Sequence, residues 1–215
     1  MKQGGRTGTS PRSAPPDGAD AGDLLDLPLR EFLDVVASED PTPGGGSAAA
    51  LAIAISAGLT AMVARASREW PEAGSAIAQA ERLRRRVAPL AQLDAEAYEE
   101  ALVTLTLPER VEPVVRDMAV GAALSRAAEV PMAIAEAGAD AACLAALVAE
   151  RGTANRRGDA VAAALLAEAG TRAAAALVAV NLLVQPGDQR AKHAELLVET
   201  ASQAAREARR AIDAA

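Results

Sequence analysis

A turn rich in proline and glycine runs directly into an alanine-rich helix in the stretch Pro41-Thr42-Pro43-Gly44-Gly45-Gly46-Ser47-Ala48-Ala49-Ala50-Leu51. Residues 42–64 carry no charge, and most of them are Ala, Gly, Ser or Thr. This length would suit a bilayer, but the proline and glycines at its start and the lack of an aromatic belt favour a helix buried inside a protein. A chain of this size can bury one helix on all sides only with help from a second subunit. We therefore expect no membrane association, and a homodimer in which Ala- and Gly-lined helices meet.

Alanine dominates the rest of the chain as well, with 57 of 215 residues, whereas the aromatic residues are only Phe32, Trp70 and Tyr98. Alanine is the strongest helix former, and the residues that strands prefer are scarce. The composition therefore predicts an all-α fold, a multi-helical bundle of about six long helices, several of them kinked. One cysteine and one histidine exclude an internal disulfide and a Cys- or His-rich metal site. The net charge of −7 argues against a nucleic-acid partner.

Apolar periodicity and the positions of proline and glycine predict the limits of the helices. Residues 1–22 contain no apolar run and are predicted to be a disordered tail without a secretory signal, followed by a single helical domain over residues 23–215. Together with the single cysteine, this indicates a cytoplasmic protein. The predicted helices are 28–38, 47–67, 71–106 with a kink at Pro89, 112–150 with a bend near Pro131, 159–184, and 189–214.

The turn at 43–47 is the first candidate for a binding site, because three glycines leave backbone N–H groups uncovered at the start of a helix. We expect Ser47 to cap this helix. The free N–H groups and the helix dipole would attract an anion or a developing oxyanion. The alternative is a tight turn that lets two helices pack closely. The glycine patterns of nucleotide-binding loops are absent.

These residues also carry a resemblance to a known family. The run from Phe32 to Ser38, the Pro-Thr-Pro-Gly-Gly-Gly-Ser turn and the helix that follows resemble the cyclodeaminase/cyclohydrolase family, which includes the cyclodeaminase domain of formiminotransferase-cyclodeaminase and stand-alone methenyltetrahydrofolate cyclohydrolases. The likeness continues through the later segments 93–98, 129–131, 155–162 and 180–182. It implies an all-helical homodimer that acts on one-carbon tetrahydrofolate derivatives without a metal or another cofactor.

Asp94 and Tyr98 are the strongest candidates for chemistry, because residues four apart lie on one face of a helix. The alanines beside Asp94 would give its carboxyl apolar surroundings that perturb its pKa. Opening or closing a methenyl bridge needs one such group to move protons near neutral pH. The alternative is a solvated aspartate with the Tyr98 ring packed in the core.

The resemblance implies further site residues. Asp94 and Asp159 would be catalytic; the turn (Pro43, Gly44, Gly45, Gly46 and Ser47), Arg68, Tyr98, Asn155 and Asn181 would bind the folate. Spacing alone makes Asp159 a helix N-cap and Asn155 a loop residue. Asn181 lies in an apolar helix, so when buried its amide must find a partner, which is either another helix or the ligand.

The sequence thus predicts a methenyltetrahydrofolate cyclohydrolase, which opens the 5,10-methenyl bridge to give 10-formyltetrahydrofolate. One alternative is the related formimidoyltetrahydrofolate cyclodeaminase. Another is a catalytically inactive helical dimer that binds folate or a partner protein, because several positions that are basic in the family are not basic here. Val180, for example, precedes Asn181 where an arginine is common.

Overall fold

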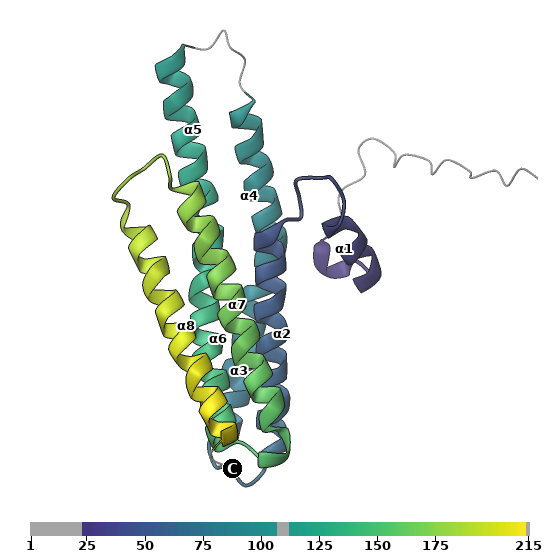
Figure 1. The fold of residues 1–215 in the computed structure, drawn as a ribbon. Helices are drawn as coiled ribbons and strands as arrows, with labels where there is room; N and C mark the ends of the chain where they lie inside the picture. The colour runs from purple at the N-terminus through teal and green to yellow at the C-terminus, as the bar shows by residue number, and fades with distance from the viewer. Residues whose placement is uncertain (1–22, 107–111, 214–215) are drawn as a thin grey trace, which may run out of the picture.

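The computed structural model describes residues 23–106 and 112–213, all of them in helices or in the connections between helices (Figure 1). Within these ranges there is no strand, which confirms the all-α prediction; the predicted tail at 1–22 lies outside the described residues. Two short 3-10 turns accompany the α-helices, η1 at Leu24–Asp26 and η2 at Ala154–Arg156. The α-helices are α1 (Leu29–Val36), α2 (Gly45–Ala66), α3 (Ala73–Val87), α4 (Leu90–Leu105), α5 (Pro113–Ala127), α6 (Glu129–Arg151), α7 (Arg157–Asn181) and α8 (Gln189–Asp213).

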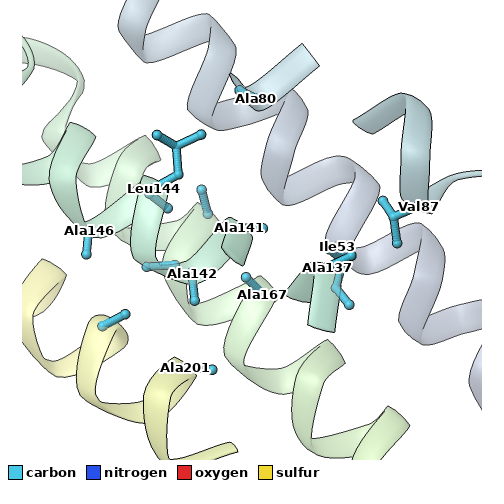
Figure 2. Close-up of a cluster of buried hydrophobic side chains, with 14 of the residues drawn as sticks. Ile53, Ala80, Val87, Ala137, Ala141, Ala142, Leu144, Ala146, Ala167 and Ala201 are labelled. Carbon is cyan, nitrogen blue, oxygen red and sulfur yellow. The ribbon is translucent and has the colours of Figure 1, made fainter. Parts of the chain in front are cut away.

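The core lies where α2, α6 and α7 meet, with α3 and α8 packed around them (Figure 2). Most of its buried side chains are alanine, and Ile53 and Ile134 are among the few large ones. Each alanine buries little area, so stability requires the helix backbones to approach closely. The buried hydroxyl of Ser56 shows this closeness, because it donates a hydrogen bond across to the carbonyl oxygen of Ala163 at 2.7 Å.

Glycine is required where α2 crosses α7. A Cβ placed on Gly170 would lie 2.6 Å from Cγ1 of Ile53 and 3.1 Å from the carbonyl oxygen of Ala49, so neither a side chain nor the backbone leaves room for it. We expect Gly170→Ala to destabilise the protein by about 1–3 kcal/mol, the usual effect of overpacking a core.

Thermal or urea unfolding of Gly170→Ala measures that effect. Gly121→Ala on α5 is the matched control, because nothing lies within 4 Å of a Cβ there. This control should stabilise the protein by up to about 1 kcal/mol, since alanine is the better helix former. Equal stability of the two variants would show that α2 and α7 are not in such close contact.

Two predicted long helices are each interrupted. The predicted helix 71–106 ends at Val87, and α4 starts afresh after Pro89. The predicted helix 112–150 is interrupted at Ala128, within one turn of Pro131 as predicted, because a proline removes the N–H that would bond four residues back and so disturbs the preceding turn. Pro131 itself lies in the first turn of α6, where a proline is tolerated.

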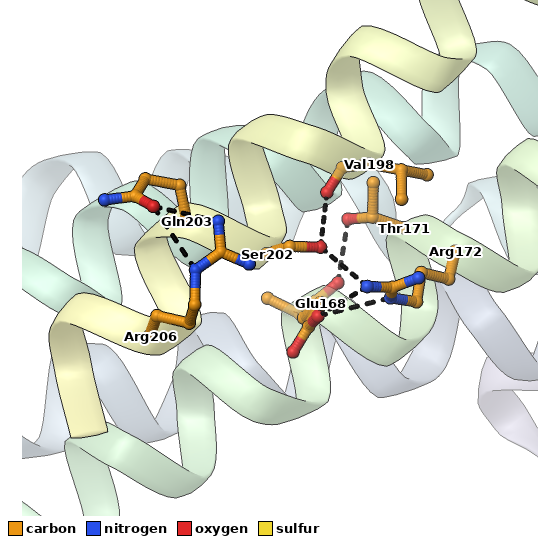
Figure 3. Close-up of polar contacts among 8 residues, drawn as sticks. Glu168, Thr171, Arg172, Val198, Ser202, Gln203 and Arg206 are labelled. Atoms are coloured by element: carbon orange, nitrogen blue, oxygen red, sulfur yellow. Dashed lines mark hydrogen bonds and ion pairs between the residues drawn. The ribbon is translucent and has the colours of Figure 1, made fainter.

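Polar contacts attach α8 to α7 (Figure 3). Arg172 pairs with Glu168 one turn earlier at 3.1 Å, and it also donates to Oγ of Ser202 at 2.9 Å. These contacts therefore link the last helix to α7.

Within one subunit, helix α2 keeps an exposed stripe along one side, so its burial on all sides, which was expected only with a second subunit, stays a prediction. Its stripe of exposed or half-exposed residues includes Ala48, Ala52, Ile55, Leu59 and Met62. Three helical stretches are long and apolar enough to cross a membrane: Gly45–Ala66, Pro113–Arg151 and Ala154–Asn181. In the apolar windows of these stretches, 61%, 72% and 50% of the residues are buried inside the bundle, where they serve helix packing.

Candidate active site

Helix α4 holds Asp94 against the first turn of α2. The side chain of Ser47 is fully buried, and its hydroxyl donates a 2.7 Å hydrogen bond to the carbonyl oxygen of Ala91. That bond fixes α2 to α4 one turn before Asp94. The residue that faces the carboxyl group from α2 is Gly46, where a Cβ would overlap the carboxyl oxygens. The missing side chain of Gly46 is therefore what allows Asp94 to lie there.

The predicted capping role of Ser47 is wrong. Helix α2 begins at Gly45, with Gly44 as its N-cap, and no side chain caps it. Because the glycines extend the helix two residues toward the N-terminus, Ser47 falls inside the first turn and turns its hydroxyl to α4. The N–H groups at the start of α2 have no earlier helical carbonyl to bond, so this end keeps donors for an anion or an oxyanion.

Burial raises the pKa of Asp94 from 3.8 to about 6, and the nearby backbone N–H of Ser47 offsets part of this rise. A carboxyl group with such a pKa exchanges protons readily near neutral pH. The Asp94 carboxyl group is thus partly withdrawn from water. The structure thus favours the chemical interpretation of Asp94 over that of a solvated aspartate.

Tyr98 lies one turn beyond Asp94 on α4 and is 38% exposed, so its ring is not a core residue. Close by, the hydroxyl of Thr42 donates to Oε1 of Glu99 at 2.6 Å and ties the Pro-Gly turn to α4. Pro43, which follows a cis peptide bond, is buried. The turn, Asp94 and Tyr98 therefore lie at one end of the bundle.

Asn181, the last residue of α7, has a helix-fastening role. Its Nδ2 donates to the carbonyl oxygen of Ala127 at 2.9 Å. In a regular helix this carbonyl would accept from the residue four positions on, but that residue is Pro131, which has no N–H. Asn181 thus replaces the missing hydrogen bond at the bend between α5 and α6.

The structure separates the other three predicted residues from Asp94. Arg68 follows the last turn of α2, Asn155 lies in η2, and Asp159 is in the first turn of α7. Ser56 of α2 contacts Ala163 of α7, and the two helices run in opposite directions. Asp159, four residues before Ala163, therefore lies near residue 60 of α2. That is 14 residues from Gly46, roughly 20 Å at 1.5 Å per residue.

Asp159 is also not the predicted N-cap of α7. The N-cap residue is Arg156, and Asp159 is the third residue of the helix. There its negative charge interacts favourably with the positive end of the helix dipole. Within one subunit the carboxyl groups of Asp94 and Asp159 are therefore too far apart to act on the same atom of a bound molecule. Among the described residues, no three His, Cys, Asp or Glu side chains gather in a way that would hold a metal ion.

Sequence reasoning missed Glu99 and the reason why position 46 must be glycine. Glu99 was not singled out, although it follows Tyr98 directly and anchors the turn through Thr42. The particular need for glycine at 46 was also missed, because three consecutive glycines look alike until the position of α4 is known.

Comparison with known proteins identifies the family of the chain. The family model described as formiminotransferase-cyclodeaminase matches residues 28–206. The chain belongs to the formiminotransferase-cyclodeaminase family. A methenyltetrahydrofolate cyclohydrolase of Methylorubrum extorquens is 36% identical over 162 residues, which cover 71% of this chain and 78% of that relative.

The family's fold is found in a solved structure as well. The crystal structure of formiminotetrahydrofolate cyclodeaminase from Thermotoga maritima matches with a TM-score of 0.77 and 26% identity, over 89% of this chain and 98% of that chain. The helical arrangement is thus shared along nearly the whole length of both proteins.

Proposed function

We propose that this member of the formiminotransferase-cyclodeaminase family is a methenyltetrahydrofolate cyclohydrolase that uses Asp94 to move protons. The single observation that carries the proposal is the half-buried Asp94 carboxyl with a pKa near 6, held against the uncapped start of α2. The 36% identity to a cyclohydrolase supports the choice of reaction. The matching regions include the Pro-Gly turn and Asp94, since the family model spans residues 28–206.

The chemistry requires one group that accepts a proton and then returns it. Water adds to the methenyl carbon between N5 and N10, and Asp94 accepts a proton from the attacking water. The carbon–N5 bond then breaks, Asp94 delivers the proton to N5, and the remaining hydroxyl proton goes to solvent as the formyl group forms on N10. The N–H groups at the start of α2 would stabilise the oxygen that becomes the formyl carbonyl.

An absorbance assay with the purified protein tests the proposal. Loss of the methenyl chromophore at a rate proportional to enzyme supports a cyclohydrolase. Release of ammonia from 5-formimidoyltetrahydrofolate, with methenyl formation, supports the cyclodeaminase to which the solved structure is similar. Folate binding without either reaction supports the inactive binding module, and absence of binding overturns all three folate functions.

We further propose that the protein is a cytoplasmic homodimer that pairs through α2 and α7. These helices are antiparallel neighbours, since Gly45 lies beside Leu177, and Ala49 and Ile53 lie beside Gly170. On each helix, the exposed residues come one position before the residues that contact the other helix. Because the two helices run in opposite directions, this one-residue offset points the exposed residues of both helices to the same side of the pair. The shared face is uncharged: Ala48, Ala52, Ile55, Leu59 and Met62 on α2, and Ala162, Leu166, Ala169, Ala173 and Val180 on α7.

Such a face is wide and apolar, as expected for an obligate contact rather than for a solvated surface. Its small residues would let the helices of two copies approach closely. A site that combines Asp94 with Asp159 would need the Asp159 of the second copy, because the two carboxyl groups of one subunit lie at different levels of the bundle.

The dimer can be tested at Ile55, which is 58% exposed at the middle of this face. We expect Ile55→Glu to weaken association by about 100-fold or more, because two uncompensated charges would be buried in each symmetric interface. Light scattering or sedimentation across a concentration series measures the change. Val103→Glu on α4, where the side chain is 71% exposed, is the matched control and should leave the oligomeric state unchanged. A wild-type protein that stays monomeric at high concentration would refute the proposal.

A further inference from the structure

A pocket of about 690 Å³ lies at the end of the bundle opposite Asp94. It is formed where the chain leaves α2 and where α6 connects to α7. Its charged and aromatic lining consists of Arg68, Glu69, Trp70, Arg151 and Arg157. None of the contacts that position Asp94 extends to this pocket, so the cyclohydrolase proposal does not account for it.

The rim of the pocket is held in shape by hydrogen bonds. The buried Ser67 hydroxyl donates to the carbonyl oxygen of Val63 at 2.8 Å and accepts from the backbone N–H of Thr153 at 2.8 Å. The end of α2 is thereby fastened to the connection between α6 and α7. The half-buried Trp70 packs against the core and forms a wall of the pocket. The concave surface is therefore preformed.

Positive charge accumulates here in a protein whose net charge is −7. Three guanidinium groups line the pocket together with one carboxylate, Glu69. Arg151 pairs at 3.2 Å only with its exposed neighbour Glu150, a contact of little energetic weight. Within residues 23–106 and 112–213, Arg68 makes no ion pair or side-chain hydrogen bond. The side chains that line the pocket thus carry more positive than negative charge.

The helix dipoles account for only part of this arrangement. Arg68 and Arg151 stand at the C-terminal ends of α2 and α6, where a cation is favourable. Arg157 is the first residue of α7, where the dipole disfavours a cation. Its Nε donates to the carbonyl oxygen of Ala149 at 3.1 Å, which fixes the orientation of the guanidinium. In the described part of the chain its terminal nitrogens have no hydrogen-bond partner, so they are available to a bound anion.

We propose that this pocket binds a multiply charged oxyanion, carried on phosphate or carboxylate groups, through Arg68, Arg151 and Arg157. Guanidinium groups suit such ligands because each can donate two parallel hydrogen bonds to one anionic group. The proposal is independent of the chemistry at Asp94 and assigns Arg68 to this site.

Trp70 provides the readout, because it is the only tryptophan of the chain and lines the pocket. The full-length protein is titrated with pyrophosphate and, separately, with citrate while its intrinsic fluorescence is recorded at constant ionic strength. We expect a saturable change with at least one of them. Tighter binding of pyrophosphate would identify phosphate groups as the natural ligand, and tighter binding of citrate would identify carboxylates.

Variants that each lack one positive charge test whether the anion binds in this pocket. Arg157→Gln should weaken binding by about tenfold or more, the loss of one charged, oriented contact. Arg126→Gln on α5, at the other end of the bundle, removes the same charge and should bind like the wild type. Circular dichroism checks that each variant is folded. A fluorescence change that does not saturate, or that is equal in Arg157→Gln and Arg126→Gln, would overturn the proposal whether or not the protein has cyclohydrolase activity.

Discussion

Replacing Asp94 with asparagine is expected to lower turnover of methenyltetrahydrofolate by about 100-fold or more, because the proton-transferring group is lost while its shape is kept. The amide still fits against Gly46, so substrate binding should change much less than kcat. Absorbance kinetics at saturating substrate measure the effect. Glu100→Gln removes an exposed carboxylate from the same helix and should leave kcat unchanged. A fully active Asp94→Asn variant would show that Asp94 is not the catalytic residue.

The same variant should be more stable than the wild type at pH 7. The pKa of Asp94 is raised on folding from 3.8 to about 6, so the folded state favours the protonated carboxyl. This contribution to stability is fully present below pH 3.8 and is lost as the pH rises through 6. Above pH 6 the ionised carboxylate therefore costs stability, about 1–2 kcal/mol after discounting for its partial exposure.

Unfolding curves across pH distinguish this effect from simple loss of function. The gain in Tm of Asp94→Asn over the wild type should appear between pH 4 and 6 and persist at higher pH. In the wild type, kcat should fall on the acidic side with an apparent pKa near 6, as the base becomes protonated. A flat difference in Tm from pH 4 to 8 would mean that burial does not perturb this carboxyl group.

Much of the fold could be predicted from the sequence, because alanine content and helical periodicity are local properties. The interruptions were harder to place. The bend at Ala128 comes three residues before the proline that causes it, since the missing hydrogen bond belongs to the preceding turn. The acceptor that this proline leaves unpaired is satisfied by Asn181, which is 54 residues away, and no local pattern indicates that pairing.

The site was predictable in parts but not in its arrangement. The spacing of Asp94 and Tyr98 placed both on one face of α4, and the glycines marked the start of α2. Their meeting depends on the reversal of the chain after α2, which is a tertiary property. For the same reason the sequence grouped Arg68, Asn155 and Asp159 with Asp94, although the length of α2 separates them. Neighbouring residues are also a poor guide to burial: Cys143 is flanked by Ala142 and Leu144, both buried, yet it is exposed on α6.

Gly46→Ala is expected to reduce activity nearly as much as loss of Asp94, because the added Cβ would overlap the Asp94 carboxyl group. The buried hydrogen bond from Ser47 to Ala91 prevents α2 and α4 from moving apart, so the carboxyl group itself must rotate out of the site. The stability cost should be modest, about 1 kcal/mol, since the end of a side chain can move more easily than a backbone. Steady-state kinetics and thermal unfolding measure the two effects separately.

Gly45→Ala is the matched control for this prediction. A Cβ at Gly45 would lie 4.0 Å from the nearest atom, Cδ1 of Leu177, in ordinary contact. Alanine there should leave kcat intact and stabilise the helix by up to about 1 kcal/mol. A second control uses Asp94→Ala, which empties the space that the new methyl group needs. In that background Gly46→Ala should no longer destabilise the protein, because the two residues are coupled by direct contact. If the stability penalty persisted without the Asp94 side chain, its cause would lie in the backbone at the start of α2, and the close approach of Gly46 to Asp94 would not explain why glycine occupies this position.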